Sequence, residues 1–214
     1  MIGFYDYTVI ATYLATLLGL MGIFQAMNGK IMPAIFCLLL SGMLDLIDGR
    51  IARTKKNRTD AEKLFGVQID SLNDMVCFGI LPSAIAYAMH HLRNPEVPVW
   101  YMAALCFFSL CGLIRLAYFN VLEEDRQSNG GTGERKHYLG LPITASTLLI
   151  PLLYLLCQAI PSAWPIIMAV GMTVGGLLYI LPLHFRHPNL AGIILLGCFG
   201  AAELACLIFL GGAW

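Results

Sequence analysis

Long apolar runs separated by short polar connections dominate the chain. A membrane-crossing α-helix needs about 20 apolar residues to span a hydrocarbon core of about 30 Å. On this criterion the hydrophobic pattern predicts seven spans, at residues 6–27, 31–53, 66–91, 98–121, 141–160, 162–183 and 189–212. We therefore expect an all-α, polytopic membrane helix bundle that forms one domain over residues 1–214.

The composition agrees with a membrane protein. Hydrophobic residues make up 58% of the chain and charged residues 12%, and the mean hydropathy is +0.74. A soluble domain has about 25% charged residues. The seven cysteines lie in apolar spans without a CxxC pair, so neither a disulfide framework nor a thiolate metal site is indicated. The net charge is zero and we find no nucleic-acid-binding signature, so no nucleic-acid partner is expected.

The basic residues predict the orientation in the membrane. If the spans alternate in direction, ten of the 13 Lys and Arg residues fall on one side, whereas only Lys30 and Arg93 fall on the other. The positive-inside rule then places the N-terminus and the polar connections in the cytoplasm, with the protein in the cell membrane. We interpret Lys55 and its basic neighbours as topology determinants or contacts to anionic lipids.

Two polar stripes interrupt the second and third predicted spans. The first consists of Asp45, Asp48, Gly49 and Ala52, and the second of Gly66, Asp70 and Asp74. Spacings of three and four residues place the members of each stripe on one helix face. Consecutive membrane helices joined by a short connection run antiparallel. Both stripes therefore lie near the cytoplasmic ends of their helices and can face each other.

Four converging carboxylates need compensation, because a carboxylate within a span is costly and like charges repel. Neither stripe contains His or Cys, and carboxylate oxygens alone suit Mg²⁺, Mn²⁺ or Ca²⁺. Gly49, Ala52 and Gly66 lack bulk, so a ligand can lie against the helix backbones. Arg53 adds a planar, bidentate phosphate donor. Together these residues predict a metal-bound diphosphate site.

The two stripes resemble the signature of the CDP-alcohol phosphatidyltransferases, and all eight signature residues are present. In this sequence the signature reads Asp45-x2-Asp48-Gly49-x2-Ala52-Arg53, followed by Gly66-x3-Asp70-x3-Asp74. Twelve residues separate Arg53 from Gly66, where the family usually has eight. The surplus falls in the polar stretch TKKNRTDAEKLF, which we expect to lengthen a solvated connection.

Further motifs resemble the phosphatidylserine synthase branch of that family. The stretch DSLNDMVCFGILPSAIAY is similar to its DSLxDxxSFGxAP pattern, with Cys77 in place of Ser and Leu81 in place of Ala. LIRLAYFN at 113–120 and YLGLP at 138–142 resemble its LRLARFN and FxGLP elements. This resemblance implies transfer of a phosphatidyl group from CDP-diacylglycerol to L-serine, which gives phosphatidylserine and CMP, by a homodimer among membrane lipids.

The resemblance also implies roles for single residues. Two divalent cations, Mg²⁺ or Mn²⁺ with Ca²⁺ as an alternative, would be held by Asp45, Asp48, Asp70 and Asp74. Asp74 would also act as the general base for the serine hydroxyl. The cytidine diphosphate would lie against Gly49, Ala52, Arg53 and Gly66. Arg115 either contacts serine or a phosphate, or pairs with an acid, and Glu203 is expected to make a packed polar contact.

Two alternatives remain open from the sequence. The same reaction class could use another acceptor, such as inositol phosphate, glycerol 3-phosphate or choline. Intramembrane acids also occur in cation transporters, which place them near the midplane of the bilayer and often on broken helices. Here the acids cluster toward one end of their spans, beside small residues and an Arg, which favours the enzyme.

Overall fold

The computed structural model describes residues 3–55, 59–128, 137–186 and 190–210. Side chains are described throughout these ranges except at positions 50, 52, 53, 125–128, 137–139, 184–186, 190–198 and 210. The described part is almost entirely helical. Its helices are α1 (Tyr7–Met27), α2 (Ile31–Thr54), α3 (Asp60–Asp74), the π-helix η1 (Met75–Ile80), α4 (Leu81–Arg93), α5 (Val99–Ser128), the 3₁₀ helix η2 (Ile143–Ala145), α6 (Ser146–Ala159), α7 (Trp164–Ile180) and α8 (Leu190–Leu210).

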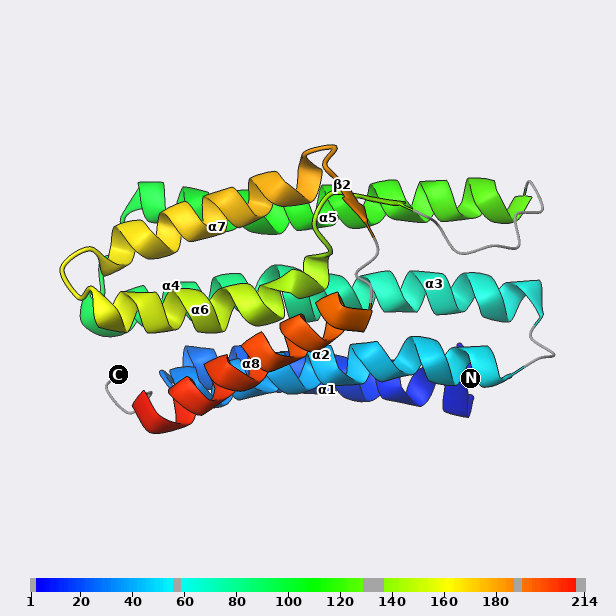
Figure 1. The fold of residues 1–214 in the computed structure, drawn as a ribbon, viewed down its shortest axis with the longest axis horizontal. Helices are drawn as coiled ribbons and strands as arrows, with labels where there is room; N and C mark the ends of the chain where they lie inside the picture. Colours follow the sequence, from blue (N-terminus) through cyan, green and yellow to red (C-terminus); the bar gives the residue numbers. More distant parts are fainter. Residues whose placement is uncertain (1–2, 56–58, 129–136, 187–189, 211–214) are drawn as a thin grey trace.

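The helices form a bundle elongated along one axis (Figure 1). Helix α3 continues through η1 into α4 as a single rod, so α1, α2, this rod, α5, α6, α7 and α8 correspond to the seven predicted spans. Helices α1 and α2 lie along each other, and α5 packs along α7. Helix α8 crosses the bundle obliquely and contacts α6. The predicted all-α, polytopic membrane architecture is confirmed.

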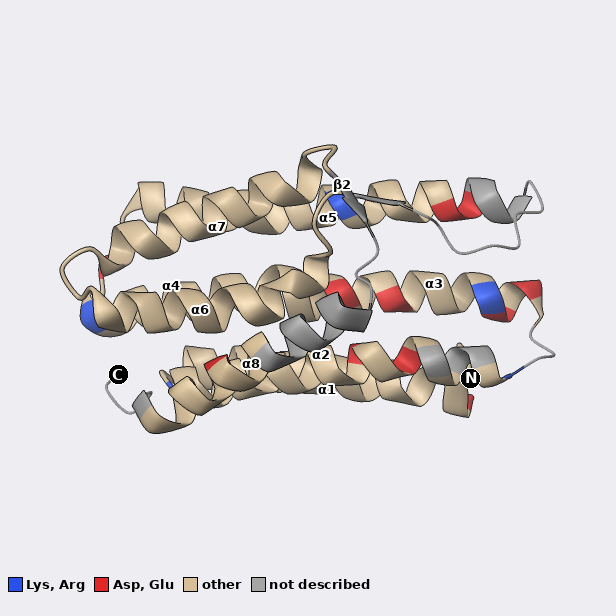
Figure 2. Cartoon of the chain, viewed as in Figure 1, with Lys and Arg blue, Asp and Glu red and all other residues tan. Residues whose placement is uncertain are grey.

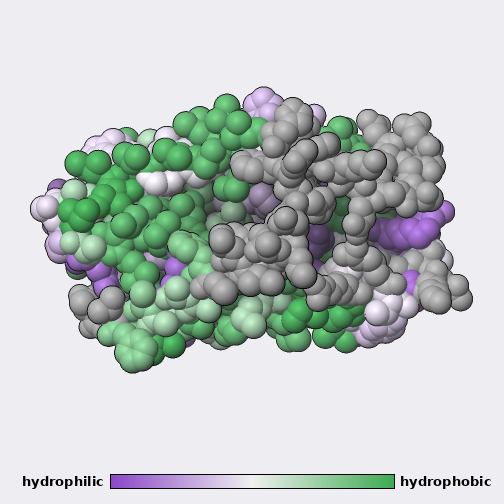
Figure 3. All heavy atoms as spheres, in the orientation of Figure 1, coloured by the Kyte–Doolittle hydropathy of each residue, from purple (hydrophilic) through white to green (hydrophobic). Residues whose placement is uncertain are grey.

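Length and composition qualify several of these helices as membrane spans. Among the described residues, four segments are long and apolar enough to cross a bilayer, namely Tyr7–Met27, Ile31–Gly49, Asp60–Arg93 and Val99–Glu124. Three shorter apolar helices follow at Ile143–Ala159, Trp164–Ile180 and Phe199–Phe209. Hydrophobic atoms cover most of the coloured part of the face in Figure 3, as expected for a surface that contacts lipid.

The third rod begins six residues before the predicted span. Thr59 forms a capping box with Glu62: the Thr59 hydroxyl accepts from the Glu62 backbone N–H at 3.2 Å, and a Glu62 carboxylate oxygen accepts from the Thr59 backbone N–H at 2.7 Å. Such a box fixes a helix start. The surplus was expected to lengthen a solvated connection before a span at 66; from Asp60 onward this stretch instead forms the first turns of α3, with Asp60 and Ala61 exposed.

Two short strands join the ends of α5 and α7 to the rest of the bundle. Strand β1 (His137–Leu139) pairs antiparallel with β2 (His184–Arg186). Gly140 follows β1 with a φ of +75°, and a Cβ there would lie 2.6 Å from the Tyr179 carbonyl oxygen. Only glycine fits this left-handed, close approach. The YLGLP element therefore has a structural role in docking this connection against the end of α7.

Buried side chains from every long rod meet in one core. Fully buried members include Ile35 and Leu38 of α2, Phe78 of η1, Ile85 of α4 and Phe108 of α5. The third rod joins this core through η1 and α4, both of which contact α2.

Candidate functional site

Three acids from α2 and α3 converge in the part of the bundle nearer the α2–α3 connection. Asp45, Asp70 and Asp74 each offer a carboxylate oxygen, and these oxygens lie within 4.8 Å of one another. The two helices run antiparallel, and the four-residue spacing of Asp70 and Asp74 keeps both on the face toward α2. The acidic segments of α2 and α3 are visible in Figure 2. The structure thus brings together three of the four predicted carboxylates.

The oxygens of this cluster fit a divalent cation. Asp74 Oδ1 is buried without a hydrogen-bond partner among the described residues. The carboxylate oxygens of Asp45 and Asp74 lie within 4.8 Å of each other, a separation at which two ionised carboxylates repel unless a proton or a cation compensates their charge. An oxygen-only ligand set in this arrangement suits a hard cation such as Mg²⁺, Mn²⁺ or Ca²⁺.

Asp48 lies beside the cluster rather than within it. Its side chain is 6% exposed, and its Oδ2 accepts a hydrogen bond of 2.9 Å from the Thr12 hydroxyl of α1. Asp48 and Asp70 both line an adjoining pocket. Asp48 and Asp70 therefore face the space where a ligand would lie, and Asp70 also belongs to the cluster with Asp45 and Asp74.

The pocket occupies about 290 Å³ between α1, α2 and α3. The lining includes Gly49 and Gly66, as predicted for the cradle of a cytidine diphosphate. The other lining residues are Thr8, Val9, Thr12, Asp48, Lys63, Val67, Ile69 and Asp70. The side chains of Ala52 and Arg53, which were predicted to join this cradle, lie outside the described residues. Helix α1 thus forms a third wall that the signature does not include.

One helical turn of α2 faces both the site and the lipid. Leu46 and Ile47 lie between the two acids of the stripe and are 73% and 46% exposed. Asp48, the next residue, is buried against α1. The turn therefore presents carboxylates inward and apolar side chains outward.

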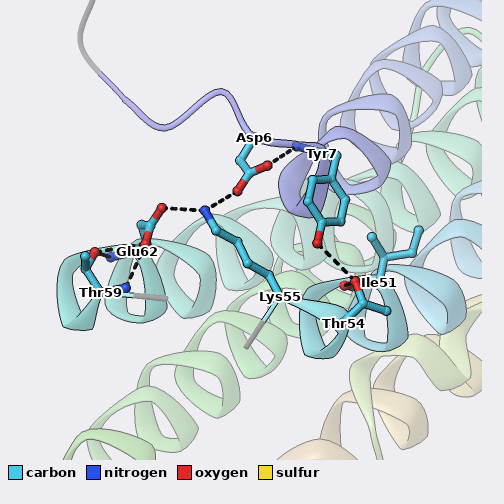
Figure 4. Close-up of polar contacts among 7 residues, drawn as sticks. All are labelled: Asp6, Tyr7, Ile51, Thr54, Lys55, Thr59 and Glu62. Carbon is cyan, nitrogen blue, oxygen red and sulfur yellow. Dashed lines mark hydrogen bonds and ion pairs between the residues drawn. The ribbon is translucent and has the colours of Figure 1, made fainter. Parts of the chain in front are cut away.

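An ion-pair network closes the polar end of the three helices (Figure 4). Lys55, which follows α2, pairs with Asp6 before α1 and with Glu62 in the first turn of α3, the latter at 2.8 Å. The hydrogen bond from Lys55 holds the pKa of the Asp6 carboxyl below its usual range, and the same contact raises the pKa of Lys55. We call this group the Lys55 clamp. Its position shows Lys55 engaged with protein, beyond the role in topology expected from the sequence.

A π-helical segment begins directly after Asp74. Within it Cys77 donates to the Ala15 carbonyl and to Asn73 Oδ1, both at 3.3 Å. Short π segments are rare and occur frequently at functional sites. Here the segment places Cys77 against α1, and the Gly79 carbonyl accepts from Ser109 of α5 at 2.8 Å. Hydrophobic periodicity did not predict this segment.

The residues expected from helix α5 have structural contacts. Ser71, next to Asp70, donates a hydrogen bond of 2.7 Å to Asn120 Oδ1 and so ties α5 to α3. Arg115 is buried, with its guanidinium carbon 4.6 Å from the centre of the Phe119 ring. The residues that line the pocket do not include Arg115. Its contact with substrate stays a prediction.

Glu203 of α8 lies apart from this site. It is 5% exposed, and neither carboxylate oxygen has a hydrogen-bond partner among the described residues. Glu203 is packed, as expected from the sequence, and its polar contact stays a prediction.

Sequence reasoning missed the contribution of α1 and of Lys63. The signal was present, because Thr8, Thr12 and Thr16 recur at intervals of four in an apolar span and share one helix face. Lys63 lines the pocket from the first turns of α3, a stretch expected to be a connection.

The fold and the site define a polytopic helical membrane protein with a carboxylate cluster beside a polar pocket at one end of its spans. The profile of the family described as CDP-alcohol phosphatidyltransferase matches residues 8–177. The matched segment includes α1, both acidic stripes and most of α7. The chain belongs to this family, and the family resemblance inferred from the signature is confirmed.

The chain is also similar to individual proteins whose names refer to serine. The chain is 36% identical over 151 residues to a CDP-diacylglycerol–serine O-phosphatidyltransferase of Saccharomyces cerevisiae, which covers 66% of this chain and 51% of the relative. It is 34% identical over 139 residues to a protein of the same name from Helicobacter pylori, with 65% and 53% covered. An archaetidylserine synthase of Methanothermobacter thermautotrophicus is 33% identical over 139 residues, with 64% and 52% covered. The chain spans about half the length of these relatives.

Proposed function

We propose that this protein transfers a phosphatidyl group from CDP-diacylglycerol to L-serine and releases phosphatidylserine and CMP. The observation that carries the proposal is the convergence of Asp45, Asp70 and Asp74 beside a pocket lined by Gly49 and Gly66. Family membership supports the phosphatidyl transfer. The names of the three relatives, all of which refer to serine, support the choice of acceptor.

The nucleotide part of the donor would lie in the pocket between α1, α2 and α3. Gly49 and Gly66 leave room for the diphosphate against the helix backbones, and Lys63 supplies a positive charge on the pocket wall. Ala52 and Arg53 complete this cradle in the proposal. The acyl chains would remain in the bilayer, next to the outward-facing Leu46 and Ile47.

The four carboxylates would bind cations, and one of them would also transfer a proton. Asp45, Asp48, Asp70 and Asp74 would hold two divalent cations, Mg²⁺ or Mn²⁺. Such ions, when bound, stabilise the charge on the entering and leaving oxygens. Asp74 would take the proton of the serine hydroxyl as its oxygen bonds to the β-phosphorus. The bond from that phosphorus to the bridging oxygen then breaks, and CMP departs with the electron pair.

The orientation and assembly are part of the proposal. The bias of basic residues supports a multi-pass protein of the cell membrane whose site opens to the cytoplasm, where serine is dissolved. The family resemblance supports a homodimer. Arg115 is proposed as a contact for serine or a phosphate, at a position outside the lining of this pocket.

The test is acceptor selection by the purified protein. In detergent–lipid micelles with CDP-diacylglycerol and Mn²⁺, we expect labelled serine to yield phosphatidylserine and CMP in equal amounts. Inositol phosphate, glycerol 3-phosphate and choline serve as competitors, and chelation by EDTA should stop CMP release until Mn²⁺ or Mg²⁺ is restored. Product with another acceptor but none with serine would reject the acceptor and retain the family reaction.

A further inference from the structure

Helix α1 presents a row of hydroxyl groups to the site. Thr8, Thr12 and Thr16 are spaced four residues apart, and Thr8 and Thr12 are buried and line the pocket. Thr12 and Thr16 both donate hydrogen bonds to polar side chains of the two signature helices. A threonine hydroxyl provides one donor, so the acceptor it selects has a defined orientation.

The contact between Thr12 and Asp48 is the buried link from α1 to α2. The donor–acceptor distance is 2.9 Å, and the two side chains are 4% and 6% exposed. A hydrogen bond to an ionised group in a buried setting is stronger than one between neutral groups. The bond engages Asp48 Oδ2 and so restrains the rotation of a carboxylate that also lines the pocket.

The contact between Thr16 and Asn73 holds α1 in register with α3. Thr16 Oγ1 lies 2.9 Å from Asn73 Oδ1 and 2.9 Å from the Thr12 carbonyl oxygen, so its single proton has two acceptors within reach. Cys77 donates to Asn73 Oδ1 at 3.3 Å, and Asn73 is 1% exposed. Asn73 precedes Asp74, so α1 is tied to both acidic stripes one turn apart.

We propose that Thr12 is a positioning residue of the site, whose hydroxyl holds the Asp48 carboxylate toward the pocket so that Asp48 can join Asp70 in binding a divalent cation. The identity of the nucleotide lipid rests on the proposed function, but the orientation of Asp48 does not. Helix α1 then contributes to metal binding in addition to packing against the other helices. The contact between Thr16 and Asn73 maintains the position of α1 along its axis, so that Thr12 stays next to Asp48.

The test measures Mn²⁺ binding to the purified full chain by electron paramagnetic resonance. Thr12→Val keeps the shape of the side chain and removes the hydroxyl. We expect it to raise the Mn²⁺ dissociation constant about tenfold, the size expected for loss of one hydrogen bond to a charged group. Thr12→Ser keeps the donor and should remain within about twofold of the parent protein. Thr173→Val, which removes a hydroxyl that bonds only the Ala169 carbonyl of α7 at 2.8 Å, is the matched control.

A double variant separates positioning from packing. Asp48→Asn should weaken Mn²⁺ binding by itself, and adding Thr12→Val should then cause no further loss, because the carboxylate to be oriented is gone. If Thr12→Val does not fold, Thr12→Ala carries the same expectation with less bulk.

Three results would overturn the inference: unchanged or tighter Mn²⁺ binding by a folded Thr12→Val, equal losses in Thr12→Val and Thr12→Ser, or additive losses in the double variant. A different outcome would separate the two proposals. If the parent protein binds Mn²⁺ but makes no phosphatidylserine, and Thr12→Val weakens Mn²⁺ binding, the proposed function is wrong and the positioning role of Thr12 is retained.

Discussion

Asp45 of α2 and Asp74 of α3 are 29 positions apart in the sequence, yet their carboxylate oxygens lie within 4.8 Å of each other in the acidic cluster. Asp74 is enclosed there, since its Oδ1 is buried without a hydrogen-bond partner among the described residues. An acid in this position can serve mainly as a cation ligand, or it can also accept a proton from the attacking alcohol. The two possibilities predict different behaviour of an Asp74→Asn variant.

Asp74→Asn separates these roles. As a general base, Asp74 contributes roughly 10² to 10⁴ in rate. We expect the variant to bind CDP-diacylglycerol within a few fold of the parent protein while phosphatidylserine formation falls at least about a hundredfold. Calorimetry of CDP-diacylglycerol binding and single-turnover release of CMP measure the two quantities.

The matched variants are Asp45→Asn and Asp70→Asn, which should lose both cation and CDP-diacylglycerol binding. Asp60→Asn, on the exposed first turn of α3, should change neither quantity. If Asp74→Asn loses binding in parallel with turnover, Asp74 is a metal ligand and the general-base role is wrong.

Lys63→Ala tests the wall of the pocket. Lys63 is about half exposed, with an ion pair of 3.0 Å to Asp60 at the helix surface, and it also lines the pocket. Because such i,i+3 surface pairs are weak, the ammonium is available to a bound diphosphate. We expect the dissociation constant for CDP-diacylglycerol to rise about tenfold, with Mn²⁺ binding unchanged. Lys30→Ala, at the turn between α1 and α2, is the control. If Lys63→Ala and Lys30→Ala bind CDP-diacylglycerol with equal affinity, Lys63 does not contact the bound diphosphate.

Asp6→Asn tests the Lys55 clamp. Asparagine keeps the capping of α1 but loses the ion pair, so we expect a lower Tm at neutral pH and a smaller loss at high salt. The pKa of Asp6 is lowered in the folded state, so its stabilisation is present above its ordinary value of 3.8 and is lost as the pH falls through the folded pKa. The difference in Tm from the parent protein should therefore vanish in acid. Glu96→Gln, which replaces an exposed acid in the connection between α4 and α5, is the control and should leave the Tm at neutral pH unchanged.

Cysteine labelling tests the orientation. In a variant freed of its native cysteines, Asp60→Cys should be shielded from an impermeant thiol reagent in intact cells, whereas Asn94→Cys should be labelled. Both positions are exposed and lie at opposite ends of one rod. Labelling of position 60 from outside would reverse the topology and place the pocket away from cytosolic serine.

Much of the architecture could be predicted from the sequence, because membrane spans depend on long apolar runs and the acidic stripes depend on helical spacing. Both properties are local. The facing of Asp45 toward Asp74 also followed from the antiparallel arrangement of consecutive helices. The start of α3 at Asp60 could have been predicted from Thr59 and Glu62, which form a recognisable capping box.

Other features depend on packing between distant segments, which no local pattern reports. The hydrogen bond from Thr12 to Asp48 requires the threonine face of α1 to turn toward α2; the four-residue spacing identifies that face but not the helix that it contacts. The π segment after Asp74 likewise depends on contacts with Ala15 and Ser109 rather than on residue periodicity. The sequence alone therefore did not predict that Asp48 lies beside the cluster of the other three acids rather than within it.

The exposed Leu46 and Ile47 lie between Asp45 and Asp48, so the proposed reaction would take place at the edge of the apolar surface and would receive its two substrates by different routes. The lipid donor would diffuse laterally and present its headgroup at the boundary of the bilayer, whereas serine would arrive from bulk water. The relevant concentration of donor is then its mole fraction in the membrane. Diluting CDP-diacylglycerol with an inert phospholipid should slow the reaction at constant bulk donor concentration, whereas diluting the whole membrane suspension at fixed serine should leave the turnover number unchanged.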